Sequence, residues 1–311
     1  MILLLSGGVG GAKLVEGFAA AIGGEKLKVV VNTGDDVELY GLRISPDIDI
    51  MLYTLGGIVN WEQGWGIADD SWHVHRQLHF YGGPAWFQLG DRDLATQLFR
   101  TELLKAGKTP SEVSRLLAQC LGVKAEVIPM TDDPVETRIV TPEGDLHFQE
   151  YLVQRGSRDP VKKIYFKGIE KARPSPGFLA GLEEAAAVII CPSNPLVSIG
   201  PILALPGVKD KLRDLNVPRI AVSPMVGRRV FKGPLARMLE DLGIVPGAFQ
   251  IAQLYAGMID YFVIDEADYQ QKELIESDLG IKVLTTNIIM QTKEDKKNLA
   301  LFLLKKTGLL T

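Results

Sequence analysis

Residues 1–13 read Met-Ile-Leu-Leu-Leu-Ser-Gly-Gly-Val-Gly-Gly-Ala-Lys, and this stretch decides the fold class. Residues 2–5 form a short apolar run, and a helix-forming run over residues 12–21 follows the glycines. Glycine permits a positive φ and close approach of a ligand to the backbone. A helix N-terminus presents free N–H groups and the positive end of the helix dipole. The order of strand, glycine loop and helix therefore predicts a phosphate-binding turn at the start of an α/β fold.

The spacing of the four glycines leaves the ligand open. Gly8 and Gly10 match the first two glycines of the dinucleotide fingerprint, but Lys13 stands where its third glycine belongs. No Gly-Lys-Ser/Thr follows, so the Walker pattern fails as well. Lys13 falls in the first helical turn, where a cation opposes the dipole unless an anion lies between them. We expect Gly7, Gly8, Gly10, Gly11 and Lys13 to bind phosphate, with a ligand-free βα turn as the alternative.

The composition excludes several classes of protein. The chain has 311 residues, 46% of them hydrophobic and 23% charged, as in an ordinary globular protein. Its net charge of −4 and the lack of a basic block argue against nucleic acid as a partner. The apolar runs are too short to span a bilayer, so no membrane partner is expected. Two cysteines, Cys120 and Cys191, make neither a disulfide framework nor a zinc site, and we expect a cytoplasmic protein.

Continuous apolar runs alternate with helical segments in the first and last parts of the chain. Strands that are apolar throughout and alternate with helices indicate a Rossmann-like doubly wound, mostly parallel sheet that is covered on both faces. The predicted strands are residues 29–33, 187–191, 219–223, 261–265 and 282–284, and the predicted helices include residues 206–215, 234–242 and 247–257.

The middle of the chain has a different pattern. Short strands separated by turns follow two helices there, which predicts an inserted helical and small antiparallel β subregion. We therefore expect a single nucleotide-binding core, about 1–70 and 170–311, with an inserted lobe at about 70–170. The predicted helices of the lobe are residues 91–107 and 110–121, and its predicted strands are residues 125–129, 136–141, 146–154 and 162–166.

Four aspartates follow the second predicted strand. Asp35 and Asp36 come directly after its end, which is the ligand-facing edge of an open α/β sheet. Asp47 and Asp49 follow Ser45 and a proline at a plausible helix start. Carboxylates beside a phosphate-binding loop repel the phosphates unless a divalent cation stands between them, and Mg²⁺ prefers such oxygen ligands. We expect a Mg²⁺ site among the four, while a helix-dipole partner or a turn residue is the alternative for each.

Two further segments carry candidate binding residues. Arg92 lies within the Gly-Asp-Arg-Asp start of a predicted helix, and Arg100 lies further along the same helix. Each of the two either contacts phosphate or belongs to a helical face exposed to solvent. Ser193, Asn194 and Ser198 follow the strand at 187–191 and suit a nucleobase, a ribose or a second phosphate. The alternative for these three is a capped turn without a ligand.

Three side-chain clusters allow both a functional and a structural interpretation. A histidine trio could bind zinc but has no third ligand cluster, so packing at the pocket is preferred. The cations in the loop at 222–234 either bind an anion or are exposed to solvent. The aromatic residues form either a wall for a heterocycle or part of the core. The trio is His73, His75 and His79; the cations are Arg228, Arg229 and Lys232; the aromatic residues are Trp61, Trp65, Trp72, Trp86 and Phe87.

Five ordered segments together closely resemble the 2-phospho-L-lactate transferase family of deazaflavin coenzyme F420 biosynthesis, in its archaeal form. The resemblance spans essentially the whole chain. The segments are Ser-Gly-Gly-Val-Gly-Gly-Ala-Lys (6–13), Asn-Thr-Gly-Asp-Asp (32–36), Ser-Pro-Asp-Ile-Asp (45–49) with Tyr-Thr-Leu-Gly-Gly (53–57), Leu-Gly-Asp-Arg-Asp-Leu-Ala-Thr (89–96) and Pro-Ser-Asn-Pro-Leu-Val-Ser-Ile-Gly-Pro-Ile (192–202).

The resemblance implies a phosphoryl transfer. The ribityl hydroxyl of the deazaflavin Fo attacks lactyl-2-diphospho-5′-guanosine, GMP leaves, and a phosphodiester joins lactate to Fo. We expect Mg²⁺ on the aspartates, and Asp49, with Asp36 second, to orient the hydroxyl or hold the metal. Gln88 and the Trp-rich stretch are expected to hold the deazaflavin ring, and Asn32 and residues 192–200 the guanosine end. Asp49→Asn is expected to abolish turnover with the fold intact.

Some features stay open at this level. The acyl group of the donor is lactyl, enolpyruvyl or glyceryl in different family members, and no residue decides among them. The family implies a homodimer, for which the leucine-rich segment 299–304 is one candidate surface. The alternatives are a nucleotide-sugar-binding regulatory homologue without transferase activity and a nicotinamide-dependent oxidoreductase. The missing third glycine and the aspartates beside the phosphate loop count against the second.

Overall fold

The computed structural model describes residues 1–227, 229–230 and 233–310. Two of the predicted loop cations, Arg228 and Lys232, therefore lie outside the described residues. Within the described residues, the centre of the fold is a seven-stranded sheet in which all neighbouring strands run parallel. Its order is β14 (Lys282–Thr285), β13 (Tyr261–Ile264), β10 (Arg219–Val222), β9 (Ala187–Ile190), β1 (Ile2–Ser6), β2 (Leu27–Val31) and β5 (Glu126–Pro129).

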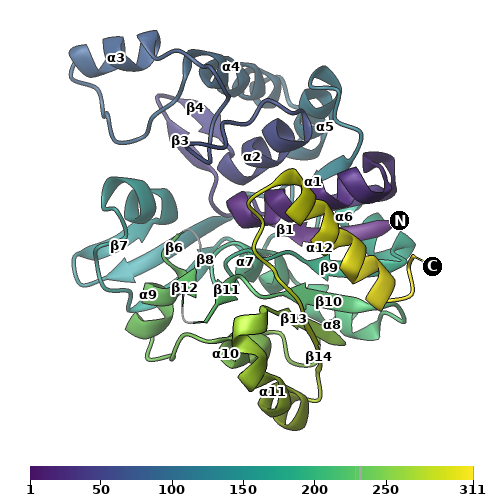
Figure 1. The fold of residues 1–311 in the computed structure, drawn as a ribbon. Coiled ribbons are helices and arrows are strands. Elements are labelled where there is room, and N and C mark those ends of the chain that lie inside the picture. Colours follow the sequence, from purple (N-terminus) through teal and green to yellow (C-terminus); the bar gives the residue numbers. More distant parts are fainter. Residues whose placement is uncertain (228, 231–232, 311) are drawn as a thin grey trace.

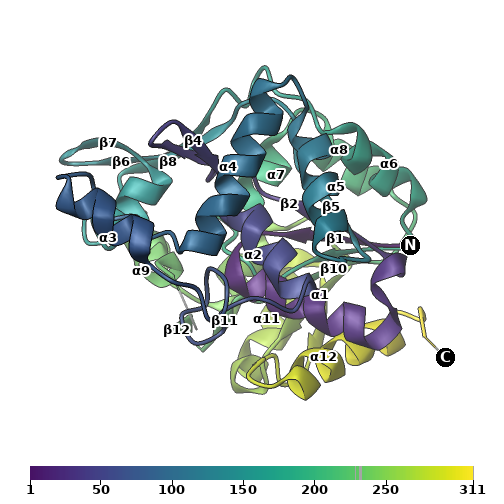
Figure 2. The ribbon, with the colours of Figure 1, turned by 90° about the horizontal axis from the view of Figure 1, so that it is seen from above.

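The predicted doubly wound α/β fold is confirmed, because helices bury both faces of this sheet. Successive residues of β1 point to opposite faces, so Leu4 packs in one apolar cluster and Leu5 in the other. One face is covered by α1 (Gly8–Ile22), α2 (Pro46–Leu55), α5 (Pro110–Cys120) and α12 (Lys293–Lys306). The other face is covered by α6 (Pro176–Glu184), α7 (Ile199–Ala204), α8 (Val208–Asp214), α9 (Leu235–Asp241), α10 (Ala248–Leu254) and α11 (Lys272–Leu279), as Figures 1 and 2 show.

Helices α1 and α12 lie side by side, and both chain termini are at the same side of the molecule (Figure 1). A Cβ built on Gly17 would lie 2.1 Å from the carbonyl oxygen of Lys296, so the glycine lets the two helix backbones approach closely. Leu299, Leu303 and Leu304 are buried in this contact. These leucines belong to the core of the chain.

The predicted lobe is divided into two insertions, which corrects one part of the sequence interpretation. Residues 125–129 were expected in the small antiparallel layer, but β5 pairs parallel with β2 at the edge of the central sheet. The first insertion holds β3 (Val37–Leu39), β4 (Leu42–Ile44), α3 (His73–Phe80) and α4 (Asp91–Lys105). The second is the antiparallel sheet β7 (Gly144–His147), β6 (Glu136–Thr141) and β8 (Lys163–Lys167).

Two other boundaries differ from the prediction. The strand expected over 146–154 ends at His147, and residues Glu150–Gln154 form a short π-helix, η2, in which the Tyr151 ring is buried. The first helix begins at Gly8, so that the glycines are part of its first turn. The remaining elements are η1 (Gly24–Lys26), η3 (Glu266–Gln271) and the hairpin of β11 (Met225–Val226) and β12 (Arg229–Val230).

The strand order sets the position of a binding site. The chain passes from β1 to β2 and β5 on one side, then returns to β9 on the other side of β1. Ligands of open α/β sheets bind at the carboxyl ends of the strands where the order reverses, and here that point lies between β1 and β9. The glycine turn follows β1, and the loop with Ser193 follows β9. Among the described residues, no helix combines the length and apolar character needed to cross a bilayer.

Candidate active site

A cavity of about 800 Å³ lies where these two loops meet. Most of the residues predicted from the sequence contribute to its wall, and a smaller group does not. The predicted residues that line it are Gly7, Gly8, Gly10, Lys13, Asp35, Asp47, Asp49, Gln88, Ser193, Asn194 and Ser198. Gly11, Asn32, Asp36 and Arg92 are not part of the wall.

The glycine turn and the loop after β9 are packed directly on each other. The Ser193 hydroxyl donates a hydrogen bond to the carbonyl oxygen of Gly7 (2.7 Å) and accepts one from its N–H (3.2 Å). A Cβ at Gly10 would lie 2.4 Å from the carbonyl oxygen of Pro192, and one at Gly11 2.1 Å from Ser6 Oγ. Gly10 and Gly11 are therefore required for this contact, and Gly11 lies beneath the turn instead of facing a ligand.

Asp47 joins the glycine turn to the start of α2. Its Oδ1 accepts a hydrogen bond from the N–H of Gly8 (2.9 Å), and its Oδ2 accepts one from Asn32 Nδ2 (3.0 Å). Asn32 is fully buried and also donates to the carbonyl oxygen of Val197 (3.3 Å). The structure thus gives Asn32 a different position from the predicted one, behind the cavity wall, where it orients Asp47.

Asp35 and Asp47 form a pair of buried carboxyl groups at the wall. Burial raises the pKa of Asp35 well above its ordinary value, and the nearby charge of Asp47 raises it further. Burial also raises the pKa of Asp47 to about 6, although Asn32 and Gly8 stabilise its charged form. Asp35 Oδ1 is buried and has no hydrogen-bond partner within the described part of the chain. Two such carboxyl groups side by side favour a bound cation.

The chemistry of the pair suits Mg²⁺, with fewer protein ligands than the four aspartates expected from the sequence. Within the described ranges, no three His, Cys, Asp or Glu side chains are arranged to hold a metal ion by themselves. Mg²⁺ is commonly held by one or two carboxylates, with waters and substrate phosphates completing its shell. The unpartnered Oδ1 of Asp35 beside Asp47 suits this arrangement. Asp35 and Asp47 are therefore the residues that would hold the ion.

These raised pKa values predict how the stability of the metal-free protein depends on pH. The fold favours the protonated forms of Asp35, Asp36, Asp47 and Asp93, so the free energy of unfolding falls as the pH rises from about 4 through about 6. At about 1.4 kcal/mol per pKa unit, a carboxyl group shifted from 3.8 to about 6 loses roughly 3 kcal/mol. Burial lowers the pKa of His147, so this single group has the opposite effect on the pH dependence.

Differential scanning calorimetry with a chelator should therefore give a higher Tm at a pH of about 5.5 than at about 7.5. Asp47→Asn should flatten the dependence because it removes one of the titrating groups. A Tm that increases steadily over this range in the wild type would contradict the assignment of these buried carboxyl groups.

Asp36, the neighbour of Asp35, points away from the cavity. Its Oδ2 accepts a hydrogen bond from the Ser45 hydroxyl (2.8 Å) and pairs with Arg43 (3.3 Å). Burial raises its pKa to about 6, while Arg43 lowers it. The predicted catalytic or metal-binding role of Asp36 is not supported by this geometry, because Ser45 and Arg43 hold its carboxylate outside the cavity wall.

Asp49 lines the cavity but is held by a buried cation. Arg100 forms an ion pair with it through both terminal nitrogens, and Gln97 Nε2 donates to Asp49 Oδ2 (2.8 Å). Arg100 is only 4% exposed, so the solvated interpretation of this residue is wrong. The spacing of Asp93, Gln97 and Arg100 places them on one face of α4. This spacing is the sequence signal from which a buried polar stripe could have been predicted.

The far part of the wall is aromatic. Trp65, Trp86 and Phe87 line the cavity, whereas Trp61 lies outside it with the Lys296 ammonium 4.0 Å from its ring centroid. Trp72 packs edge-to-face on Trp65, with 5.8 Å between ring centroids. Part of the aromatic interval thus lines the cavity, Trp72 packs against that part, and Trp61 packs against the core.

Lys13 lies at the cavity, whereas Arg92 and the histidines of α3 lie away from it. Lys13 lines the cavity and donates to the carbonyl oxygen of Met290 (3.1 Å). Arg92 is exposed and donates to the carbonyl oxygen of Ala68 (3.1 Å), so phosphate contact is not supported. The histidines of α3 lie on a helix without buried residues and do not line the cavity.

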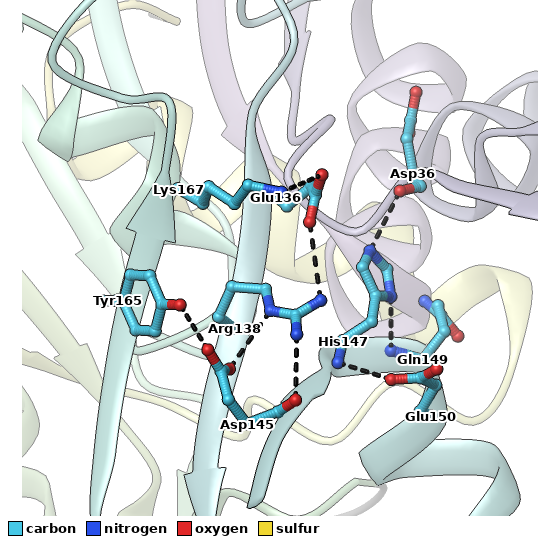
Figure 3. Close-up of polar contacts among 9 residues, drawn as sticks. All are labelled: Asp36, Glu136, Arg138, Asp145, His147, Gln149, Glu150, Tyr165 and Lys167. Atoms are coloured by element: carbon cyan, nitrogen blue, oxygen red, sulfur yellow. Dashed lines mark hydrogen bonds and ion pairs between the residues drawn. The ribbon is translucent and has the colours of Figure 1, made fainter.

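His147, which sequence reasoning missed, connects the antiparallel sheet to the aspartate loop (Figure 3). Its Nε2 lies 3.1 Å from the carbonyl oxygen of Asp36, and its Nδ1 is 3.1 Å from the N–H of Gln149. Because Nδ1 accepts, Nε2 carries the proton and donates to Asp36. Gln149 and Phe148 line the cavity. One neutral imidazole therefore fixes the Asp35–Asp36 turn relative to a second segment of the wall.

Replacing His147 with phenylalanine should lower kcat/KM about tenfold and destabilise the fold by about 2 kcal/mol, because it leaves two backbone groups without partners. Steady-state kinetics and urea unfolding measure both effects. His79→Phe, on the exposed helix α3, is the control and should change neither. Wild-type kinetics and stability in His147→Phe would show that this connection is dispensable.

Comparison with known proteins identifies relatives of this chain. A family model described as 2-phospho-L-lactate transferase CofD matches residues 2–297. A protein of Streptomyces coelicolor named phosphoenolpyruvate transferase is 41% identical over 273 residues, which is 86% of each chain. A protein of Methanothermobacter thermautotrophicus named 2-phospho-L-lactate transferase is 40% identical over 305 residues, covering 98% of this chain and 97% of its own.

A solved structure from Bacillus halodurans has the same fold. It is described as a member of the UPF0052 family and superposes with a TM-score of 0.61, covering 96% of this chain and 98% of its own. The two sequences are 12% identical, so this likeness concerns the fold alone.

Proposed function

The chain belongs to the 2-phospho-L-lactate transferase CofD family, and from this premise we propose the reaction that this transferase performs. It transfers the 2-phospholactate group of lactyl-2-diphospho-5′-guanosine to the ribityl hydroxyl of Fo. The hydroxyl oxygen forms a bond to the phosphorus next to the lactyl group, the bond from that phosphorus to GMP breaks, and the hydroxyl proton is released. The products are GMP and a phosphodiester of lactate and Fo.

One observation carries the proposal. A single cavity joins a glycine turn and two carboxyl groups to an aromatic wall. A diphosphate with its cation requires the first part, and a planar heterocycle requires the second. Phosphoryl transfer depends mainly on positioning and on neutralising charge, which these groups supply without a covalent intermediate.

At the phosphate end, the glycine turn and the carboxyl pair have different roles. The backbone at Gly10 and the Lys13 ammonium bind the diphosphate, and Asn194 and Ser198 bind the guanosine end. Asp35 and Asp47 hold Mg²⁺, which supplies charge neutralisation for the leaving GMP phosphate. Asn32 keeps Asp47 oriented through its amide.

Between the two ends, Asp49 is proposed to orient the attacking hydroxyl. It lies on α2 between Asp47 and Tyr53, whose separation of six residues corresponds to about 9 Å along the helix. Arg100 and Gln97 fix the Asp49 carboxylate in one orientation. Gln88, at the rim beside Phe87, contacts the ring of the acceptor.

The acyl group of the donor has a second candidate. The relative from Streptomyces coelicolor is named for phosphoenolpyruvate and is as similar to this chain as the one named for 2-phospho-L-lactate. An enolpyruvyl donor differs from a lactyl donor only at carbon atoms next to the transferred phosphate. The same site chemistry therefore serves both donors.

The test is a turnover assay with Fo, Mg²⁺ and either the lactyl or the enolpyruvyl guanosine donor, with GMP and the phosphodiester followed by mass spectrometry. Product that disappears with EDTA supports both the reaction and the metal. A chain that binds a nucleotide sugar and forms no product with either donor would instead be a regulatory homologue. The homodimer and the cytoplasmic location stay predictions, which sedimentation and fractionation can check.

A further inference from the structure

One buried carboxyl group at the aromatic part of the wall has no role in the reaction above. Asp93 lies in the first turn of α4, is 6% exposed, and lines the same cavity as Trp65 and Trp86. An ionisable group is costly to bury unless it finds a partner. The position of Asp93 is therefore informative about the ligand.

The two oxygens of Asp93 have different surroundings. Oδ1 accepts hydrogen bonds from the Tyr53 hydroxyl (2.8 Å) and from Gln97 Nε2 (2.9 Å). No donor to Oδ2 is found within residues 1–227, 229–230 and 233–310. Oδ2 faces Gly66, another lining residue, where a built Cβ would be 4.0 Å away. One oxygen is thus held by the protein, and the other is available to a molecule in the cavity.

The electrostatic setting agrees with an acceptor role. Burial and the charge of Asp49 raise the pKa of Asp93, while Tyr53, Gln97 and Arg100 oppose the rise, and the net value is about 6. Arg100 pairs with Asp49 instead of with Asp93. A hydrogen-bond donor on a ligand would stabilise the carboxylate where the protein does not.

We propose that Asp93 Oδ2 accepts a hydrogen bond from an N–H or O–H on the ring of the acceptor substrate and thereby selects acceptors that carry such a donor. The inference rests on the proposed function, since it assigns the aromatic end to the acceptor. Asp47 lies at the phosphate end of α2, and Tyr53 hydrogen-bonds to Asp93. The six residues from Asp47 to Tyr53 correspond to a rise of about 9 Å along the helix axis. This separation suits a heterocycle joined to the attacking hydroxyl by a short polyol chain.

A binding experiment with the full chain tests this assignment. Fo quenching of tryptophan fluorescence gives its Kd for the wild type and for Asp93→Asn, whose amide oxygen can still accept from Tyr53 and Gln97. We expect the variant to bind Fo at least tenfold more weakly and to have a correspondingly raised KM for Fo. The KM for the guanosine donor should stay within about twofold of the wild-type value. The lost hydrogen bond is made to the acceptor, so the substitution reduces selectivity for the acceptor alone. Glu102→Gln, an exposed carboxylate on the same helix, is the matched control and should bind Fo as the wild type does.

Acceptor analogues make the test independent of how well the variant folds. One analogue is methylated at the imide nitrogen of the deazaflavin, and one lacks its ring hydroxyl. One of them should bind the wild type at least tenfold more weakly than Fo, and that penalty should disappear in Asp93→Asn. Equal penalties in both proteins, or unchanged binding of Fo by Asp93→Asn, would overturn the proposal. A wild type that neither binds nor converts Fo would instead refute the proposed function, so the two failures are distinguishable.

Discussion

Replacing Asp35 with asparagine should lower kcat for the transfer by on the order of 10³-fold and, at the same time, raise the Tm of the metal-free protein. Activity falls because a neutral amide is a poor ligand for a divalent cation, and the metal contributes several kcal/mol of charge stabilisation in the transition state. Stability rises because the substitution removes a buried carboxyl group that lies beside Asp47 and whose Oδ1 has no partner. A gain of about 1 kcal/mol in the free energy of unfolding should raise the Tm by roughly 2 °C or more.

The opposite signs of the two effects make this prediction specific. Asp36→Asn is the matched control, since the adjacent carboxylate bonds to Ser45 and Arg43 outside the cavity. It should keep kcat within about tenfold of the wild type. Kinetics at saturating Mg²⁺ and calorimetry in EDTA measure both variants. If Asp36→Asn proves as inactive as Asp35→Asn, the assignment of the metal to Asp35 and Asp47 fails.

Replacing Arg100 with methionine should destabilise the protein by about 3–5 kcal/mol. The substitution leaves the Asp49 carboxylate buried without its cation, and removing one partner of a buried ion pair costs much more than removing both. The free energy of unfolding in urea measures the loss. The double variant Asp49→Asn with Arg100→Met should recover most of it.

The exposed Arg92 of the same helix provides the control, and Arg92→Met should cost less than about 1 kcal/mol. This ion pair also changes the expectation for Asp49→Asn. The sequence suggested that this variant keeps an intact fold, but in the structure it leaves Arg100 buried without its anion. Loss of turnover in Asp49→Asn must therefore be read together with its stability. An Arg100→Met protein as stable as the wild type would show that the pair carries no net stability.

Part of the site could be predicted from the sequence because it lies at the ends of strands. The glycine turn and Ser193 each follow an apolar strand, and such ends gather at one edge of a parallel sheet. The direction of individual side chains could not be predicted. Asp35 and Asp36 are neighbours of the same type, yet only Asp35 reaches the cavity. Which of two adjacent residues faces a cavity depends on the register of the turn against Thr137 and His147, which belong to a distant sheet.

The sequence by itself determined the fold class, and most of the site residues predicted from it line the cavity. Apolar runs that alternate with helices, a glycine turn before a helix and a cluster of aspartates are local patterns, and local backbone preferences suffice to read them. Only the tertiary structure decided that β1 lies beside β9, that Arg100 is buried against Asp49, and that β5 joins the central sheet. These features depend on contacts between segments from tens to nearly two hundred residues apart. Their energy comes from burial and packing of whole elements, which no short stretch of sequence encodes.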